Sequence, residues 1–302
     1  MLAKINKEPF DSPDWVFEEK YDGYRALAFC DGQGGVTLYS RNLLSFNDKY
    51  RPIVAALKNI PYQCLLDGEI VVESKNGKSL FQLLQNYMNT GKGKLKYRVF
   101  DLLQLEGNDT TQLPLLKRKE LLELLLKKFK QPDIGYSPHV ASKGVKLYQS
   151  AIKKGWEGVM AKRADSAYLT DKRSNDWLKI KIAKQQEAII VGFTAPQGTR
   201  KYFGSLLLAA FKNKQLKYMG HCGTGFDEKT LKALYGKFKP LFTDKLPLKQ
   251  KVLPNNTVQW LKPKLVCQVK FTEWTEEESM RHPVYLGLRE DKAWKEVIIE
   301  KT

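Results

Sequence analysis

The chain has 302 residues, 42% of them hydrophobic, which is long and apolar enough for a substantial buried core. Its longest apolar run, 206–211, is far too short to cross a bilayer, and its N-terminal residues lack the apolar segment of a secretory signal, so we expect a cytoplasmic protein. A net charge of +18 predicts a polyanionic partner such as nucleic acid, and four widely spaced cysteines argue against disulfides or a zinc site and are expected to be reduced and buried.

The positive charge is spread over the whole chain. Up to Lys184 there are 31 basic and 21 acidic residues, and beyond it 20 and 12, so the surplus is +10 and then +8. Two basic halves are typical of a clamp around nucleic acid and not of a basic tail. Charge alone does not distinguish an enzyme from a coat protein.

The first part of the chain mixes strand-like runs with helical stretches, which predicts an α+β domain over 1–184. The expected strands are 26–29, 35–39, 64–72, 97–103, 158–162 and 177–182. A helix is expected over 114–129, where a proline opens a run with leucines on one broad face. A second helix is expected over 144–154, before two glycines that mark a turn.

The second part, 185–302, changes to short strands broken by turns. We expect strands at 187–194, 205–211, 215–222, 257–261 and 266–272, and one helix that follows Asp227 as its N-cap and ends near residue 238. Five strands and one helix suit a small barrel of the oligonucleotide-binding (OB) kind. The connector between the two domains is expected at 183–187.

A lysine stands in an unusual setting in the stretch EEKYDGYR, residues 18–25. Lysine is a nucleophile only when its amine is neutral, a state that burial or nearby positive charge favours. Lys20 follows an apolar run, and Asp22 and Gly23 predict a tight turn directly after it. On its own this octapeptide is better explained by a solvated lysine at a strand end and a hairpin turn.

Five further motifs follow in order along the chain. They are SRN at 40–42, LDGEIV at 66–71, FDL at 100–102, EGVMAK at 157–162 with WLKIK at 177–181, and RHPVYLGLREDK at 281–292. Lys179 and Lys181 alternate with apolar residues and therefore share one face of a strand. In this order the series resembles the motif set of the covalent nucleotidyltransferases, which include DNA ligases, RNA ligases and capping enzymes.

The resemblance is strongest to the ATP-dependent DNA ligases, in particular the ligase domain of the bacterial end-joining enzyme ligase D, and covers nearly the whole chain. It implies a nucleotidyltransferase (adenylation) domain of antiparallel sheets with flanking helices over 1–184, then an OB-fold β-barrel over 185–302. Two positions depart from the family pattern, since Leu43 replaces a common glycine and Tyr21 a common tryptophan. Only 19 residues precede Lys20, which fits either a stand-alone ligase or a domain of a longer ligase D.

The resemblance also implies a reaction and its residues. Lys20 would attack the α-phosphate of ATP to form a covalent lysyl-AMP, which is then used to seal 5′-phosphate and 3′-hydroxyl ends of duplex DNA in non-homologous end joining. The implied catalytic residues are Lys20, Asp22, Lys179, Lys181, Arg289 and Lys292. Those implied to bind the nucleotide are Glu18, Arg25, Arg41, Glu69, Phe100, Val159, Lys179 and Lys181. Glu69 and Glu157 would hold Mg²⁺ or Mn²⁺, and Arg25 and Arg41 would contact DNA.

The family further suggests nicked or broken duplex DNA and a Ku-type end-binding protein as partners, a monomeric state, and a nucleoid-associated enzyme in a bacterial cytoplasm. Two other readings remain open. An RNA ligase or capping enzyme would share the chemistry of Lys20, although the RHPVYLGLREDK ending favours a DNA ligase. A non-catalytic nucleic-acid binder would need the basic surface but not Lys20.

Overall fold

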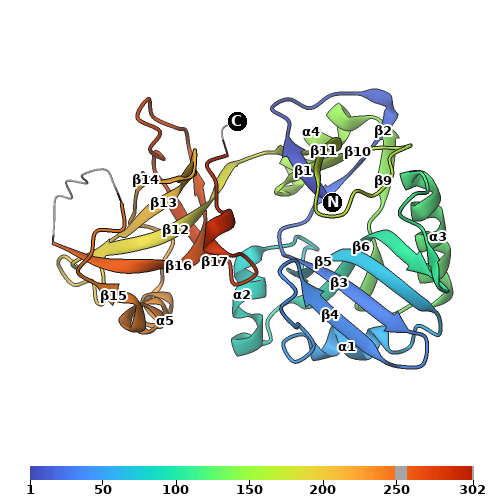
Figure 1. Ribbon diagram of the computed structural model, residues 1–302, viewed down its shortest axis with the longest axis horizontal. Coiled ribbons are helices and arrows are strands. Elements are labelled where there is room, and N and C mark those ends of the chain that lie inside the picture. Colours follow the sequence, from blue (N-terminus) through green and yellow to red (C-terminus); the bar gives the residue numbers. More distant parts are fainter. Residues whose placement is uncertain (249–256, 301–302) are drawn as a thin grey trace. The chain divides into compact units, whose positions relative to one another are not determined.

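Three β-sheets form the framework of the protein in the computed structural model, which describes residues 1–248 and 257–300 (Figure 1). Two of these sheets lie in a first unit, Met1–Ile182, and the third lies in a second unit that begins at Ala183. Residues 249–256 and 301–302 of the domain expected over 185–302 lie outside the described residues. In the described part of the chain, no helix is both long and apolar enough to cross a membrane.

One sheet of the first unit has the strand order β1-β11-β10-β2-β9, with β1 and β11 parallel and the other neighbours antiparallel. Its strands are β1 (Leu2–Ile5), β2 (Ser12–Lys20), β9 (His139–Ser142), β10 (Gly158–Arg163) and β11 (Arg173–Lys181). Helix α4 (Gly144–Lys154) packs on β2 and β10, as Figure 1 shows. This face of the sheet is apolar because Phe17, Val159 and Ile180 of three neighbouring strands all point to it and are fully buried together.

The other sheet of the first unit has the order β4-β3-β5-β6-β7, with β8 pairing in parallel to β6. Its strands are β3 (Tyr24–Asp31), β4 (Val36–Ser40), β5 (Gln63–Glu73), β6 (Lys94–Leu105), β7 (Asn108–Asp109) and β8 (Ile134–Tyr136). The helices beside it are α1 (Arg51–Leu57), α2 (Phe81–Thr90) and α3 (Leu115–Lys128). Helix α3 matches the predicted span to within one residue, and Leu115, Leu122 and Leu125 on its inner face are buried.

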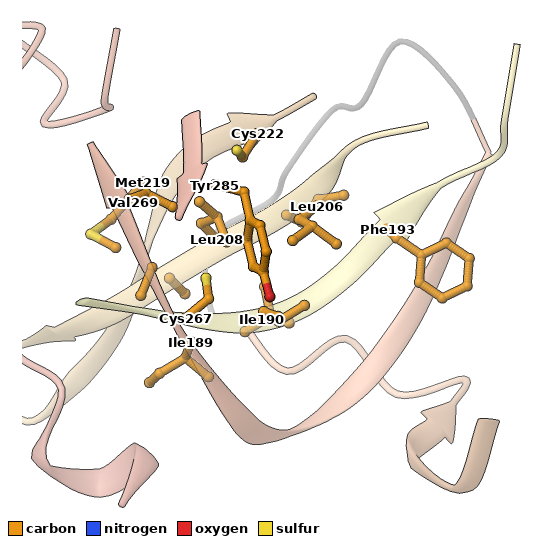
Figure 2. Close-up of a cluster of buried hydrophobic side chains, with 14 of the residues drawn as sticks. Ile189, Ile190, Phe193, Leu206, Leu208, Met219, Cys222, Cys267, Val269 and Tyr285 are labelled. Atoms are coloured by element: carbon orange, nitrogen blue, oxygen red, sulfur yellow. The ribbon is translucent and has the colours of Figure 1, made fainter. Parts of the chain in front are cut away.

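The sheet of the second unit has the order β14-β13-β12-β16-β15, with β17 pairing to β16. Its elements are β12 (Lys184–Thr194), β13 (Leu206–Lys212), β14 (Gln215–Cys222), α5 (Glu228–Phe238), η1 (Lys239–Leu241), β15 (Phe242–Thr243), β16 (Val258–Phe271), β17 (Val284–Leu288) and η2 (Trp294–Glu296). Figure 2 shows side chains from several of these strands, including Ile190, Leu208 and Val269, meeting in one buried cluster. Asp227 caps α5 as predicted, since its carboxylate accepts a 2.7 Å hydrogen bond from the amide of Thr230.

Several elements differ from the sequence prediction. The strands expected at 257–261 and 266–272 form the single strand β16, which passes Pro263 through a bulge opposite Val191 because a proline cannot donate to the ladder. Strand β12 already begins at Lys184, so most of the connector expected over 183–187 belongs to the second unit's sheet. The short helices α1 and α2 and the strands β1, β7, β8, β9, β15 and β17 were not predicted. All four cysteines are free and buried, as expected.

Candidate active site

Three adjacent strands place the three predicted lysines on one face of the β1-β11-β10-β2-β9 sheet. Lys20 at the end of β2 lies opposite Gly158 of β10, and Gly158 lies opposite Lys181 of β11. Two residues away along each strand, Met160 lies opposite both Glu18 and Lys179. Directly opposed residues of antiparallel strands point to the same side, so this face carries Glu18, Lys20, Lys179 and Lys181 together.

Glycines permit this close arrangement. A Cβ atom on Gly158 would lie 2.2 Å from the carbonyl oxygen of Ile180, and one on Gly23 would lie 2.1 Å from that of Ile70. Neither position can therefore accept another residue without a shift of the backbone. The glycines of the YDG and EGVM motifs are thus required by packing around Lys20.

Lys20 is ion-paired with Glu157, whose carboxylate receives a very short hydrogen bond from Nζ. Burial lowers the pKa of Lys20, but Glu157, followed by Asp22 and Glu69, raises it, and the net pKa lies above the usual lysine value. The expectation of a lysine held neutral by its surroundings is therefore wrong for this arrangement. To act as a nucleophile, Lys20 has to pass its proton on or exchange Glu157 for another partner.

Glu18 is enclosed by cations. Its Oε1 atom lies 2.8 Å from Nζ of Lys119 and its Oε2 atom 3.0 Å from Nζ of Lys162, and the hydroxyl of Ser137 donates to Oε2 at 3.2 Å. Burial raises the pKa of Glu18, but the two lysines together lower it by more, so the net pKa lies below the usual glutamate value. The carboxylate is therefore ionised and can only accept hydrogen bonds.

An aromatic surface lies next to these charges. Phe100 of β6 meets Trp177 edge to face with ring centroids 5.9 Å apart, and Nζ of Lys162 lies 4.4 Å from the Phe100 ring centre and 4.2 Å from that of Trp177. Phe100, Trp177 and Met160 belong to one hydrophobic cluster. The half-buried ring of Phe100 is suited to stack on a base.

Val159, predicted to contact the base, is placed elsewhere. It is fully buried on the opposite face of the sheet, among Phe17, Ala161 and Ile180. Side chains alternate along a strand, so its neighbour Met160 is the residue on the face of Glu18 and Lys20. The assignment of Val159 was therefore wrong.

Arg25 is held by a buried carboxylate. Its Nε and Nη2 atoms donate to Oδ1 and Oδ2 of Asp67 at 2.9 and 2.5 Å, and Nη2 also donates to the hydroxyl of Tyr168 at 2.9 Å. Arg25 and Arg41 both line a pocket of about 390 Å³ that Tyr168 also borders. Two guanidinium groups at one pocket are suited to bind phosphate.

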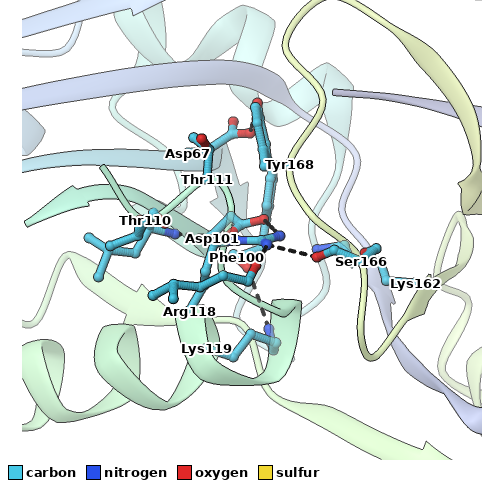
Figure 3. Close-up of polar contacts among 12 residues, drawn as sticks. Asp67, Phe100, Asp101, Thr110, Thr111, Arg118, Lys119, Lys162, Ser166 and Tyr168 are labelled. Atoms are coloured by element: carbon cyan, nitrogen blue, oxygen red, sulfur yellow. Dashed lines mark hydrogen bonds and ion pairs between the residues drawn. The ribbon is translucent and has the colours of Figure 1, made fainter. Parts of the chain in front are cut away.

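A second ion pair, which is wholly buried, joins α3 to β6. Arg118 of α3 donates to both oxygens of Asp101 and to the carbonyl of Ser166, as Figure 3 shows together with the neighbouring Lys119. Asp101 directly follows Phe100. The helix therefore fixes the strand that carries the aromatic ring.

The carboxylates near Lys20 fit a divalent cation only in part. Asp22, Glu69 and Glu157 all raise the pKa of Lys20, and carboxylate oxygens are the ligands that Mg²⁺ and Mn²⁺ prefer. Within the described residues, however, no group of three or more His, Cys, Asp or Glu side chains is arranged to hold a metal ion. A cation at Glu69 and Glu157 would need phosphate oxygens and water to complete its coordination.

Arg289 and Lys292 are placed in the second unit, after β17. Arg289 donates from Nε and Nη2 to the two oxygens of Asp291 at 2.8 and 2.7 Å, and Nζ of Lys292 lies 3.1 Å from Oε1 of Glu187. Burial raises the pKa of Glu187, but Lys292 and Arg289 bring the net pKa below the usual value. The two cations are therefore held in fixed positions by carboxylates of their own unit.

Sequence reasoning missed three residues of this site. Met160 could have been found by counting alternation along EGVMAK, and the same count places Lys162 on the face of Glu18. Lys119 gave no signal, because it is one of several lysines on a helix whose other lysines, such as Lys117 and Lys127, are exposed.

Comparison with known proteins gives consistent matches over the whole chain. Residues 1–181 match the family described as "ATP dependent DNA ligase domain", and residues 199–292 match "ATP dependent DNA ligase C terminal region". A multifunctional non-homologous end joining protein LigD from Pseudomonas aeruginosa is 37% identical over 99% of the chain. A multifunctional non-homologous end joining DNA repair protein LigD from Mycobacterium tuberculosis is 34% identical over 95% of it. The chain spans 36% and 37% of the length of these two relatives.

Solved structures agree with these matches. A mycobacterial DNA ligase D complexed with ATP and MES aligns with a TM-score of 0.74 at 32% identity, covering 99% of this chain and 97% of that one. The ligase domain of M. tuberculosis LigD aligns with a TM-score of 0.57 over the same shares of both chains at 32% identity. The predicted fold class, a nucleotidyltransferase domain followed by an OB-fold domain, is confirmed.

Proposed function

The chain belongs to the ATP-dependent DNA ligase family, and on that premise we propose that it joins 5′-phosphate and 3′-hydroxyl ends of duplex DNA through a lysyl-AMP intermediate. The observation that carries the proposal is the position of Lys20, which shares one sheet face with Lys179 and Lys181 and is paired with Glu157. A nucleophile next to fixed cations is what transfer of a nucleotidyl group requires.

The proposed reaction consists of three successive displacements at phosphorus. Nζ of Lys20, after losing its proton, attacks the α-phosphorus of ATP; a P–N bond forms, the bond to the bridging oxygen breaks and pyrophosphate leaves. A 5′-phosphate oxygen of DNA then attacks the same phosphorus and releases Lys20. Finally the 3′-hydroxyl oxygen loses its proton to solvent and attacks the 5′-phosphorus, the bond from that phosphorus to the oxygen shared with AMP breaks, and AMP leaves. Oε2 of Glu157 is hydrogen-bonded to Nζ and is placed to accept the first proton.

The other residues have roles that follow from their positions. Glu18 would accept from the 6-amino group of adenine, with Phe100 and Met160 on the faces of the base, and Glu69 would bind the ribose. Lys179 and Lys181 would hold the α-phosphate, Arg25 and Arg41 the 5′-phosphate of DNA, and Arg289 and Lys292 the leaving pyrophosphate. Glu69 and Glu157 would hold Mg²⁺ or Mn²⁺, which supplies positive charge to the phosphate oxygens when bound.

The wider setting follows from the relatives. We propose that residues 1–184 form the adenylation domain and 185–302 the OB-fold domain, and that the enzyme acts as a monomer on broken chromosomal DNA at the nucleoid, together with a Ku-type end-binding protein. The net charge of +18 supports DNA as substrate. The names of the end-joining relatives support the repair pathway.

The test is the intact mass of the purified protein after incubation with ATP or GTP and a divalent cation, and again after addition of nicked DNA. We expect a gain of one AMP from ATP only, located at Lys20 and lost on addition of nicked DNA. Lys20→Ala should gain nothing, whereas Lys146→Ala, an exposed lysine on α4, should behave like the wild type. Labelling from GTP instead would indicate capping chemistry, and no labelling by either nucleotide, in a protein whose starting mass shows no bound AMP, would reject the proposal.

A further inference from the structure

A buried charge cluster, formed by Glu18, Lys119, Ser137 and Lys162, joins parts of the chain that are far apart in sequence. Glu18 comes from β2, Lys119 from α3, Lys162 from β10, and Ser137 follows β8. The side chains of Glu18, Lys119 and Lys162 are each at most 2% exposed. Such burial is costly for a charged group, so a role beyond solubility is expected for each of them.

The cluster holds two cations for one anion. Lys119 lies beside Oε1 of Glu18 and Lys162 beside Oε2, so each oxygen has its own cation, and the cluster carries a surplus positive charge that must be stabilised in another way. The surroundings provide this: Lys162 lies against the rings of Phe100 and Trp177, and Nζ of Lys119 donates to the carbonyl of Ser137 at 3.2 Å and lies 4.8 Å from the ring centre of Tyr136. These contacts favour the charged form of each lysine, whereas burial, followed by the charge of Lys119, lowers the pKa of Lys162.

The surplus fixes what kind of hydrogen bond Glu18 can make. A buried glutamate with no cation beside it would be neutral and could donate as well as accept, whereas a carboxylate between two ammonium groups only accepts. Adenine offers a donor at position 6, its amino group. Hypoxanthine has an acceptor, the 6-oxo group, in place of this amino group, and its adjacent ring nitrogen carries a proton.

We infer that Lys119 and Lys162 are positioning residues that make the site selective for 6-aminopurine over 6-oxopurine nucleotides, by fixing Glu18 as an acceptor. The inference rests on the adenylation reaction proposed above. A buried acceptor that faces a second acceptor leaves both unpaired, which is the arrangement by which sites reject a near-isosteric substrate.

The experiment compares self-nucleotidylation by ATP and by ITP, followed as intact mass over time, on one preparation of each protein. The ratio of the two rates does not depend on the folded fraction, because both nucleotides meet the same preparation. We expect Lys119→Met, a neutral side chain of similar length, to lower the ATP-to-ITP ratio at least about tenfold. Lys119→Arg, which keeps the charge, should retain most of the ratio, and Lys127→Met, an exposed lysine on the same helix, should leave it unchanged.

An unchanged ratio in Lys119→Met, whatever its rate with ATP, would overturn the inference and leave the ligase proposal intact. If that variant takes no label from either nucleotide, the ratio is measured for Lys119→Gln and Lys162→Met, and an unchanged ratio in either variant that labels has the same meaning. Loss of all labelling in the three variants, with melting midpoints like that of the wild type, would also count against it. A wild-type protein that takes label from neither nucleotide rejects the proposed function itself.

Discussion

Arg118 and Asp101 form an ion pair that is wholly enclosed, with Nε 2.7 Å from Oδ1, Nη2 3.0 Å from Oδ2, and no exposed area on either side chain. It joins α3 to the strand that carries Phe100. Removing one partner of such a pair leaves the other charge buried and uncompensated.

Arg118→Met should therefore lower the free energy of unfolding by about 3–5 kcal/mol. Urea denaturation followed by circular dichroism measures this. Lys117→Met, on the same helix with a side chain 67% exposed, is the matched control and should change stability by less than about 0.5 kcal/mol. Equal effects of the two substitutions would mean that the buried pair contributes nothing specific.

Lys20→Ala should separate chemistry from DNA binding. It removes the proposed nucleophile, but the basic surface remains, so affinity for nicked duplex should stay within about threefold of the wild type and should fall steeply as salt is raised. Fluorescence anisotropy at several salt concentrations measures the affinity. Nick sealing by the variant, starting from ATP, would show that another residue carries the nucleotide.

Glu19 should make stability depend on pH. Burial, with Glu73 adding to it and Arg98 opposing it, raises its pKa from 4.5 to about 7, so the folded protein binds more protons than the unfolded chain between these values. Stability contributed by this group is thus present below about pH 4.5 and is lost as pH rises to about 7.

Glu19→Gln removes this titration. The variant should gain melting temperature relative to the wild type at pH 8, and the gain should be smaller at pH 5. Thermal melts of both proteins across this range measure the difference. Parallel profiles would show that Glu19 titrates with an ordinary pKa.

Two glycines should respond in opposite ways to alanine. In Gly158→Ala the new Cβ would lie 2.2 Å from the carbonyl oxygen of Ile180, so the strands beside Lys20 must separate, and we expect slower adenylation and a loss of about 2 kcal/mol or more. At Gly236 of α5 a new methyl group would meet no atom within 4 Å beyond the backbone of its own helix, so Gly236→Ala should add about 0.5–1 kcal/mol. Chemical denaturation and adenylation rates test both.

The sequence predicted the parts of this molecule that depend on local periodicity. The alternation in WLKIK correctly placed Lys179 and Lys181 on one face, and the leucine pattern located α3. The strands expected at 257–261 and 266–272 are one strand because a bulge lets β16 continue past Pro263, a tertiary effect that a single segment does not show. Leu43 adopts a φ of 59°, which explains why glycine suits this turn and why the departure is tolerated.

Contacts between distant segments were beyond the sequence. Glu157 pairs with Lys20 across 137 residues, and that contact reverses the expected direction of the lysine's pKa. Lys119 looks like any lysine of an amphipathic helix until the fold brings it to Glu18. Motifs thus identify reactive residues, whereas their charge states are set by partners that only the tertiary structure provides.

The four buried cysteines give the protein an internal reporter. Cys30 and Cys64 face each other across β3 and β5 in the first unit, and Cys222 and Cys267 lie in the core of the second. Burial raises the pKa of Cys222 to about 11 and also raises that of Cys267, which suppresses the reactive thiolates. Alkylating reagents will therefore modify each pair only when its own unit opens, so the labelling rate of each pair reads the opening of one domain independently of the other.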